Sequence, residues 1–282
     1  MARLGPGDLV LCPGTVPKAT FRARAAAAAA GGFSGIGLWL PHRLRAHAEG
    51  MSDTDMRAIL GDHALVVTDV EAITDFGPCF RGGADTAREP TAQERLAYEV
   101  ASAVGATTVT LVEGPGEPIP VEPASEAFAL LCDRAAAHGL DVAIEFWAYS
   151  TIDARKAAAI VASAARGNGG LLVDTWHAHH DPQAADMLRG VPNGGVKSVQ
   201  IADVGSEASA DYFAATMHAR RLPGDGVADL VSWVRLLDAI GARVPLGVEV
   251  LSDALHALAP DEAARRAGNA LRALLAAARA EP

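Results

Sequence analysis

Short apolar segments alternate with longer helical segments along all 282 residues of the chain. The apolar segments are rich in Val, Ile and Leu and carry few charges, which is typical of parallel strands buried on both faces. Strands are predicted at Leu9–Cys12, Ile36–Leu40, Leu65–Val70, Thr107–Val112, Val142–Phe146, Leu171–Asp174, Val196–Ile201 and Leu246–Val250. The helices that follow them are predicted at Pro17–Gly31, Ser52–His63, Thr91–Val104, Glu122–His138, Ile152–Arg166, Pro182–Arg189, Ala228–Ile240 and Pro260–Ala280. This alternation predicts an α/β fold, a single (β/α)8 TIM barrel over residues 1–282, whereas a doubly wound sheet would use fewer strands or add a domain.

The bulk composition argues against several other classes of protein. Half of the residues are hydrophobic, but no run of about 18 uncharged apolar residues occurs, so no membrane span is predicted. The formal net charge is −10 without a basic cluster, whereas nucleic-acid binding needs a positive surface. Cys12, Cys79 and Cys132 form no close pair in the sequence, which favours a reducing cytoplasm over a disulfide framework. We therefore expect a cytoplasmic protein without membrane or nucleic-acid partners, and the sequence leaves open whether it forms a homo-oligomer.

Two predicted loops are longer than a barrel needs, Thr74–Pro90 and Val204–Gly226. Both follow strands, so both are expected on the C-terminal face, where barrel enzymes build their sites. Long loops there are usually lids or specificity elements, and a mobile surface loop is the alternative for the first one. The second carries His218, Arg220 and Arg221, which could pair with a carboxylate or phosphate of a substrate. An exposed basic loop without such a task is equally consistent with the sequence.

Four polar residues each end an apolar run in the second half of the chain: Glu145, Asp174, Gln200 and Glu249. A carboxylate in a buried strand is costly unless something pairs with it. Because the C-terminal ends of barrel strands face one mouth, the four groups are expected to converge there. Three carboxylates and one carboxamide suit Mg²⁺, Mn²⁺ or Co²⁺, whereas Zn²⁺ usually recruits His or Cys. One such residue alone would be typical of a helix cap or an ion pair, but the fourfold recurrence favours a divalent-metal site.

The order of these residues resembles the xylose isomerase-like barrels and, within them, the sugar phosphate isomerase/epimerase family. The matching segments are Ile144-Glu145-Phe146, Val173-Asp174-Thr-Trp-His177, Val199-Gln200-Ile-Ala-Asp203, Arg221-Leu-Pro-Gly-Asp-Gly226 and Gly247-Val-Glu249-Val. The resemblance covers nearly the whole chain, more loosely in the front half, and its motifs are specific to the superfamily and not to one reaction. Relatives in this group include inosose dehydratases, 3-dehydroshikimate dehydratases and endonuclease IV-like nucleases. The nucleases use several His ligands on the early strands, for which this chain offers only His42 and His63.

The resemblance implies that Glu145, Asp174, Gln200 and Glu249 hold one divalent ion. It also implies that Glu145 and Glu249 act as base and acid in removing a proton α to a carbonyl. The substrate would then be a sugar or a similar polyhydroxy ketone, and the enzyme an isomerase or epimerase. In relatives the residue that matches His177 touches the substrate. Trp147 follows Glu145 closely and is a further candidate for substrate contact.

Two other functions remain compatible with the sequence. Many epimerases of the family carry His where this chain has Gln200, and such a Gln occurs in the 3-dehydroshikimate dehydratase branch. Members of that branch also carry a basic segment before their Pro-Gly motif, similar to residues 217–224. The alternative is therefore a metal-dependent dehydratase of the 3-dehydroshikimate or inosose type. A non-catalytic barrel that binds a metabolite is a third hypothesis, and it requires that the residues bind no metal.

Overall fold

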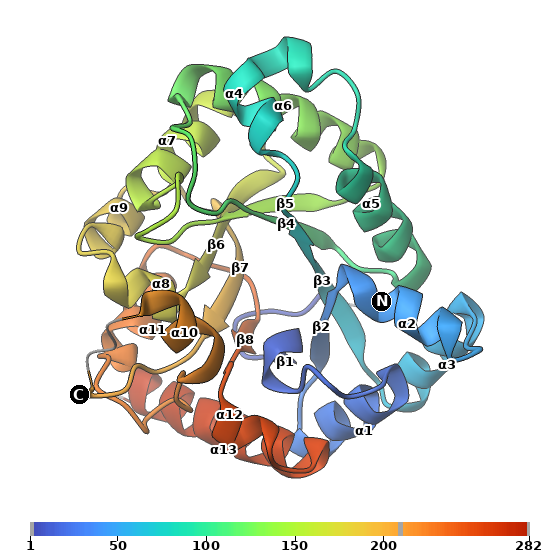
Figure 1. Ribbon diagram of the computed structural model, residues 1–282. Coiled ribbons are helices and arrows are strands. Elements are labelled where there is room, and N and C mark those ends of the chain that lie inside the picture. The colour runs from blue at the N-terminus through green and yellow to red at the C-terminus, as the bar shows by residue number, and fades with distance from the viewer. Residues whose placement is uncertain (1–2, 208–210, 281–282) are drawn as a thin grey trace.

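A computed structural model of the protein describes residues 3–207 and 211–280. Within these ranges eight parallel strands form one closed barrel, in which each strand pairs with the next and the last pairs with the first (Figure 1). The strands are β1 Leu9–Leu11, β2 Gly35–Trp39, β3 Val66–Ile73, β4 Thr108–Val112, β5 Asp141–Glu145, β6 Gly169–Asp174, β7 Val196–Ile201 and β8 Leu246–Val248. The predicted TIM barrel is therefore confirmed.

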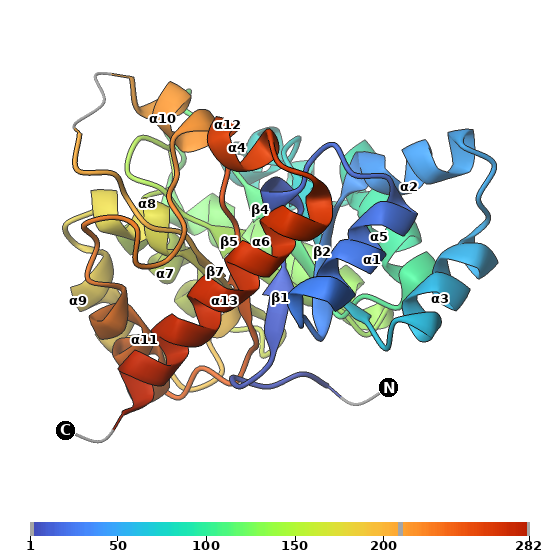
Figure 2. The ribbon, with the colours of Figure 1, turned by 90° about the horizontal axis from the view of Figure 1, so that it is seen from below.

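Helices surround this barrel on its outside and also cover part of its C-terminal mouth. They are η1 Pro13–Thr15, α1 Phe21–Gly31, α2 Leu40–Ala48, α3 Asp53–Asp62, α4 Gly77–Thr86, α5 Ala92–Val104, α6 Val121–Ala137, α7 Ala154–Ala164, α8 Thr175–His180, α9 Ala184–Arg189, α10 Tyr212–His218, α11 Leu230–Ala239, α12 Asp253–His256 and α13 Pro260–Arg279. Figure 2 shows both ends of the chain at one end of the barrel and α10 and α12 at the other. The mouth is thus framed by short helices that lie in the connections after the strands.

Side-chain caps fix where several of the helices begin. The Ser52 hydroxyl accepts a hydrogen bond from the Asp55 N–H at 3.2 Å and starts α3, as the sequence predicted. The Thr91 hydroxyl caps α5 in the same way, because it accepts a hydrogen bond from the Glu94 N–H at 3.1 Å. These caps satisfy N–H groups that have no partner inside the helix. The helix predicted from Pro17 begins later, at Phe21, because Thr20 is the residue that caps it.

The structure corrects both predicted long loops and adds a helix after β2. Residues Gly77–Thr86 form α4 inside the first loop, although its three glycines and one proline are poor helix formers. Residues Tyr212–His218 form α10 inside the second loop, where the Asp211 side chain accepts from Ala214 N and caps the helix. The expected strand Ile36–Leu40 ends one residue earlier, because Leu40 begins α2. For α4, packing against α6 and not helix propensity accounts for the helix.

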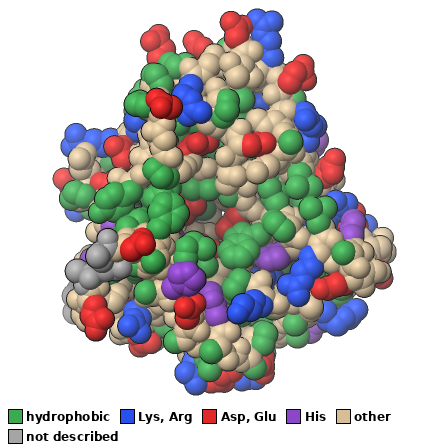
Figure 3. Space-filling model, viewed as in Figure 1, with side chains coloured by type: hydrophobic (Ala, Val, Ile, Leu, Met, Phe, Trp, Pro, Cys, Tyr) green, Lys and Arg blue, Asp and Glu red, His purple; other side chains and the backbone are tan. Residues whose placement is uncertain are grey.

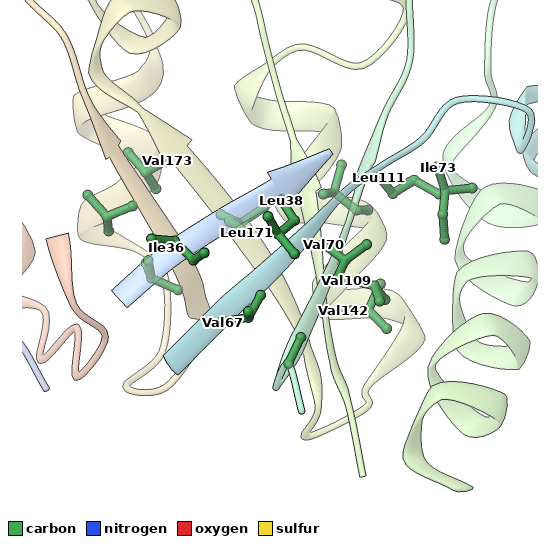
Figure 4. Close-up of a cluster of buried hydrophobic side chains, with 14 of the residues drawn as sticks. Ile36, Leu38, Val67, Val70, Ile73, Val109, Leu111, Val142, Leu171 and Val173 are labelled. Atoms are coloured by element: carbon green, nitrogen blue, oxygen red, sulfur yellow. The ribbon is translucent and has the colours of Figure 1, made fainter. Parts of the chain in front are cut away.

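The strands place large apolar side chains on the outside of the barrel and small or polar ones inside. On β4, Val109 and Leu111 are fully buried and alternate with Thr108 and Thr110, as the period of two of a strand requires. Figure 4 shows part of the resulting core, with labelled apolar side chains from β2 to β6. Thr108 and Thr110 therefore stand at inward positions of β4 that branched apolar residues usually fill in this fold. A cavity of about 410 Å³ opens at the N-terminal end of the barrel, and Asp69 is among its lining residues.

No helix within residues 3–207 and 211–280 is long and apolar enough to cross a membrane. Cys12, Cys79 and Cys132 are all buried and free. Packing and hydrogen bonds, without disulfide cross-links among these three thiols, hold this part of the chain together.

The contact between α1 and α13 closes the ring of helices and yields a stability prediction. A Cβ at Gly268 of α13 would lie 2.2 Å from the Gly31 carbonyl oxygen of α1, whereas a Cβ at Gly61 of α3 would meet nothing within 4 Å. Gly268→Ala is expected to destabilise the protein by about 1–3 kcal/mol, because the two helices must separate. The matched Gly61→Ala is expected to stabilise it by about 0.5–1 kcal/mol. Urea unfolding measures both, and equal effects of the two substitutions would contradict this account of the packing.

Candidate active site

A cavity of about 420 Å³ opens at the C-terminal mouth of the barrel. Figure 3 looks onto this face and shows hydrophobic side chains around a central hollow with acidic groups inside it. Four carboxylic acids line the cavity, namely Glu71, Glu113, Glu145 and Glu249. Aromatic rings line it as well: Trp39, Trp147, Tyr212 and Phe213. The site therefore combines buried acidic groups with an apolar wall.

Glu145, Asp174 and His177 lie together at this mouth. Glu145 is the last residue of β5, Asp174 is the last residue of β6, and His177 follows on α8. His177 Nε2 lies 3.5 Å from Glu145 Oε1 and 3.7 Å from Asp174 Oδ2. One ligand atom from each of the three residues lies within 4.8 Å of the other two. This spacing is compatible with a shared metal ion.

Two donors fix the Asp174 carboxylate. The Trp176 N–H donates to Oδ1 at 2.8 Å, so Asp174 caps α8 at the point where β6 ends. Arg220 Nη1 donates to Oδ2 at 2.6 Å, and both side chains are almost completely buried. A buried carboxylate needs such partners, and a charged donor is the strongest of them.

Gln200 and Glu249 reach the same mouth from β7 and from the residue after β8. Gln200 is the register partner of Asp174 on one side and of Gly247 on the other. Its Nε2 donates to Glu71 Oε1 at 2.8 Å, while its Oε1 is buried without a hydrogen-bond partner in the described part of the chain. Glu249 Oε1 accepts a hydrogen bond from the Gly14 N–H at 3.2 Å. All four predicted strand-end residues are thus at the mouth, with Glu249 outside the cluster of Glu145, Asp174 and His177.

Burial and mutual repulsion raise the proton affinity of these acids. Burial, with the charges of Asp174 and Glu249, raises the pKa of Glu145 to about 8. Burial raises the pKa of Glu249 to about 7, although the Arg220 charge opposes the shift. Burial, followed by the Glu249 charge, also raises the pKa of Glu71 well above its ordinary value. A cation placed among these carboxylates would reverse the sign of such shifts.

His177 and Trp147 belong to a wall of stacked rings beside the acids. Burial lowers the pKa of His177 to about 3, so the imidazole is neutral near pH 7. His177 Nδ1 lies 2.6 Å from the Tyr212 hydroxyl. Trp147 Nε1 donates to the Glu113 carbonyl at 2.9 Å, and its ring lies nearly parallel to that of Tyr212. Residues after β5 and residues of α8 and α10 therefore form one side of the cavity.

The basic segment after α10 divides between the cavity and the surface. Arg220 lines the cavity and is 2% exposed. Arg221 is exposed, and His218 is exposed and lies 3.0 Å from Asp253. Neither His218 nor Arg221 is among the described residues that line the cavity. The structure thus separates two neighbouring arginines that the sequence could not tell apart.

Asp203 organises the Pro-Gly-Asp-Gly segment that follows these arginines. Its carboxylate accepts hydrogen bonds from the N–H groups of Gly224, Gly226 and Ala228, at 2.9, 3.1 and 3.0 Å. Asp203 also forms an antiparallel bridge with Arg221. A Cβ at Gly226 would lie 2.2 Å from the Val204 carbonyl oxygen, so glycine is required there. Asp203 therefore fixes the backbone of the Pro-Gly-Asp-Gly segment.

The sequence reasoning missed two acids of the site, Glu71 and Glu113. Glu71 lies on β3, which runs to Ile73 and not to Val70 as predicted. Glu113 directly follows β4, the same position that Glu249 occupies after β8. Both could have been found by extending the search for strand-end carboxylates to the first half of the barrel. Glu113 Oε1, like Gln200 Oε1, is a buried atom for which residues 3–207 and 211–280 provide no hydrogen-bond partner.

The fold and the site together define a class, a (β/α)8 barrel with an acidic pocket at its C-terminal mouth. Within this class, the chain belongs to the xylose isomerase-like TIM barrel family, whose model matches residues 24–274. The match leaves out only short segments at the two ends of the barrel sequence. The resemblance predicted from the strand-end motifs is therefore confirmed at the level of the family.

Individual relatives carry the names of different reactions. The chain is 30% identical over 269 residues to the 3-dehydroshikimate dehydratase of Pseudomonas aeruginosa, a match that covers 93% of this chain and 40% of that protein. The crystal structure of the IOLI protein with a bound zinc atom has a TM-score of 0.84 at 19% identity and covers 97% of this chain and all of that one. The structure of D-allulose 3-epimerase from Methylomonas sp., in complex with D-allulose, has a TM-score of 0.73 at 16% identity. The match covers 97% of this chain and 99% of that one. These two structures show a shared fold, and the chain spans less than half of the curated dehydratase.

The crowding of acids predicts a pH-dependent stability. The folded-state pKa of Glu145 is about 8, above the ordinary 4.5. Its contribution to stability is therefore present below pH 4.5 and is lost as the pH rises through 8. In EDTA at pH 8, Glu145→Gln is expected to raise the Tm by about 2–4 °C or more, and the gain should shrink at pH 5. Calorimetry at the two pH values measures this, and a gain that is independent of pH would contradict it.

Proposed function

We propose that the protein is a divalent-metal-dependent enzyme that removes a proton α to the carbonyl group of a polyhydroxy ketone, as an isomerase or epimerase. The observation that carries the proposal is the convergence of strand-end acids with an unpartnered amide oxygen, Gln200 Oε1, at the mouth. A buried carbonyl oxygen that is surrounded by carboxylates has no hydrogen-bond donor nearby. A bound cation would interact favourably with this oxygen and with the carboxylates. Membership of a family with relatives named epimerase and dehydratase supports the same class of chemistry.

The residues present fit a divalent cation. Glu145, Asp174, Gln200 and Glu249 would hold it through oxygen atoms, and His177 Nε2 lies close to the first two. Such a donor set favours Mn²⁺, Mg²⁺ or Co²⁺, and one nearby imidazole makes Zn²⁺ chemically acceptable as well. When bound, the ion would act as a Lewis acid that polarises the substrate carbonyl and stabilises negative charge on its oxygen.

In this proposal the two glutamates would exchange protons with one substrate carbon. Glu145 ends β5 and Glu249 follows β8, so their side chains enter the mouth from different arcs of the barrel. In an epimerisation, one carboxylate takes the proton from the carbon next to the carbonyl and the other returns a proton to the opposite face. His177 Nε2 and the ring of Trp147 line the space beside them and would orient the substrate. Positioned groups of this kind typically accelerate proton transfer by about 10²–10⁴.

The charges around the cavity favour an uncharged substrate. Arg220 is the only arginine or lysine among the described residues that line it. Its guanidinium is already bound to Asp174 and to the Thr216 carbonyl, at 2.6 and 2.9 Å. Apart from the proposed metal ion, a carboxylate or phosphate would therefore meet Glu71 and Glu113 without an uncommitted basic side chain. Hydroxyl groups of a sugar or a cyclitol could instead donate to the carboxylates that line the cavity.

A metal-dependent dehydratase is the second candidate. The 30% identity to a 3-dehydroshikimate dehydratase and the presence of Gln200 favour it. The first step, removal of the α proton, would be shared with the epimerase. In a dehydratase the electron pair then expels a neighbouring hydroxyl group as water, which makes the reaction visible as a new ultraviolet chromophore.

Metal removal tests the proposed chemistry directly. Dialysis against EDTA is expected to abolish exchange of a substrate α proton with D₂O, and added Mn²⁺ is expected to restore it, because the cation stabilises the charge that develops on the carbonyl oxygen. Glu249→Gln is expected to lower the exchange rate of the reloaded protein by about 10²–10⁴. Proton NMR measures the exchange, and elemental analysis measures the metal. A protein that binds no divalent ion would instead support the non-catalytic barrel.

A substrate panel separates the two reactions and tests the charge argument. The Mn²⁺-loaded protein is incubated in D₂O with uncharged ketoses and keto-cyclitols, with sugar phosphates and with 3-dehydroshikimate. Exchange is expected with an uncharged member, because an anion would face unpaired carboxylates in the pocket. NMR follows exchange, and ultraviolet absorbance follows dehydration. Turnover of 3-dehydroshikimate to a chromophoric product would assign the dehydratase reaction and refute the preference for uncharged substrates.

A further inference from the structure

Glu71 and Gln200 meet across the interior of the barrel. Glu71 belongs to β3 and Gln200 to β7, so neither strand is a neighbour of the other in the sheet. Gln200 Nε2 donates to Glu71 Oε1 at 2.8 Å, and the two residues are 1% and 7% exposed. This contact ties the acid that the sequence reasoning missed to one of the four strand-end residues.

The contact decides which end of the Gln200 amide faces the mouth. An amide nitrogen is a donor and cannot ligate a cation, whereas the amide oxygen can. Glu71 Oε1 accepts the hydrogen bond from Gln200, so the amide is oriented with Nε2 toward Glu71 and Oε1 pointing elsewhere. Oε1 is the atom that has no hydrogen-bond partner among the described residues, and it belongs to the register partner of Asp174. The Gln200 side chain can present either its oxygen or its NH₂ group to the ion, and only the oxygen can act as a ligand.

The surrounding residues leave room for this arrangement. A Cβ at Gly37 of β2 would lie 2.9 Å from Asp69 Oδ2 and 3.5 Å from Glu71 Oε1. Any larger side chain there would press on the two acids of β3. The interior of the barrel next to β3 is therefore shaped to keep a buried carboxylate, at an evident cost in desolvation.

We propose that Glu71 is a positioning residue of the metal site, which orients the Gln200 amide so that Oε1 is presented to a divalent cation. This rests on the proposed function, in which Gln200 is a metal ligand. Hydrogen bonds from outer residues commonly orient metal ligands in this way, and their loss typically lowers metal affinity about 10–100-fold. Glu71 does not need to touch the ion or the substrate for this role.

Calorimetric titration of the metal-free protein with Mn²⁺ tests the proposal. Glu71→Ala is expected to weaken Mn²⁺ binding about 10–100-fold. Glu71→Gln keeps an acceptor oxygen for Gln200 Nε2 and is expected to stay within about threefold of the parent chain. Glu113→Ala removes a buried carboxylate of the same mouth that does not bond to Gln200, so it measures the effect of charge alone and is expected to change affinity less than Glu71→Ala. Thermal unfolding without metal checks that each variant is folded.

A double-mutant cycle separates positioning from a direct effect. If Glu71 acts only through Gln200, then Gln200→Ala and the Glu71→Ala/Gln200→Ala double variant are expected to bind Mn²⁺ equally. Fully additive losses would overturn the proposal, as would parent-like binding by Glu71→Ala. An equal loss in Glu71→Gln and Glu71→Ala would also overturn it, since charge and not hydrogen bonding would then be responsible. A parent chain that binds no Mn²⁺ would refute the proposed function itself, a result distinct from these.

Discussion

The concentration of carboxylic acids in one buried space is the constraint on which the rest of the structure depends. Glu71, Glu113, Glu145 and Glu249 line the same mouth, and Asp174 lies beside them. Each is costly to bury, and together they repel one another. Arg220 compensates for part of this charge through Asp174. The burial of a large apolar core offsets the cost of the remainder.

The side chains that face the barrel interior leave room for these acids. On β4 and β5, Thr108, Thr110 and Ala143 lie on the same face as Glu145, and Val109, Leu111, Val142 and Ile144 lie on the other face. Small inward side chains such as Gly37 leave space for carboxylates deep in the barrel. The connections after the strands then complete the site. Asp203 holds the Pro-Gly-Asp-Gly segment and pairs with Arg221, while Arg220 bonds to Thr216 and Asp174 and lines the cavity.

Family membership and site chemistry carry different amounts of information about function. The family model covers most of the chain, a curated relative is named a dehydratase, and a solved structure with the same fold is named an epimerase. An acidic mouth is compatible with either reaction. What distinguishes them is how the pocket treats the charge and the leaving group of its substrate. Glu113 and the guanidinium of Arg220, which is already bound to Asp174, are therefore more informative about the substrate than the strand-end residues are.

The sequence by itself determined the order of strands and helices, the closed barrel and the positions of Glu145, Asp174, Gln200 and Glu249, because periodicity and strand-end polarity are local properties of the chain. It did not reveal α10, or α4, whose glycine-rich residues are helical where they pack against α6. It also could not choose between Arg220 and Arg221, or pair Glu71 with Gln200 from the opposite side of the barrel. Those features depend on which side chains face inward and meet across the interior. That is a property of register and closure, which only the tertiary structure decides.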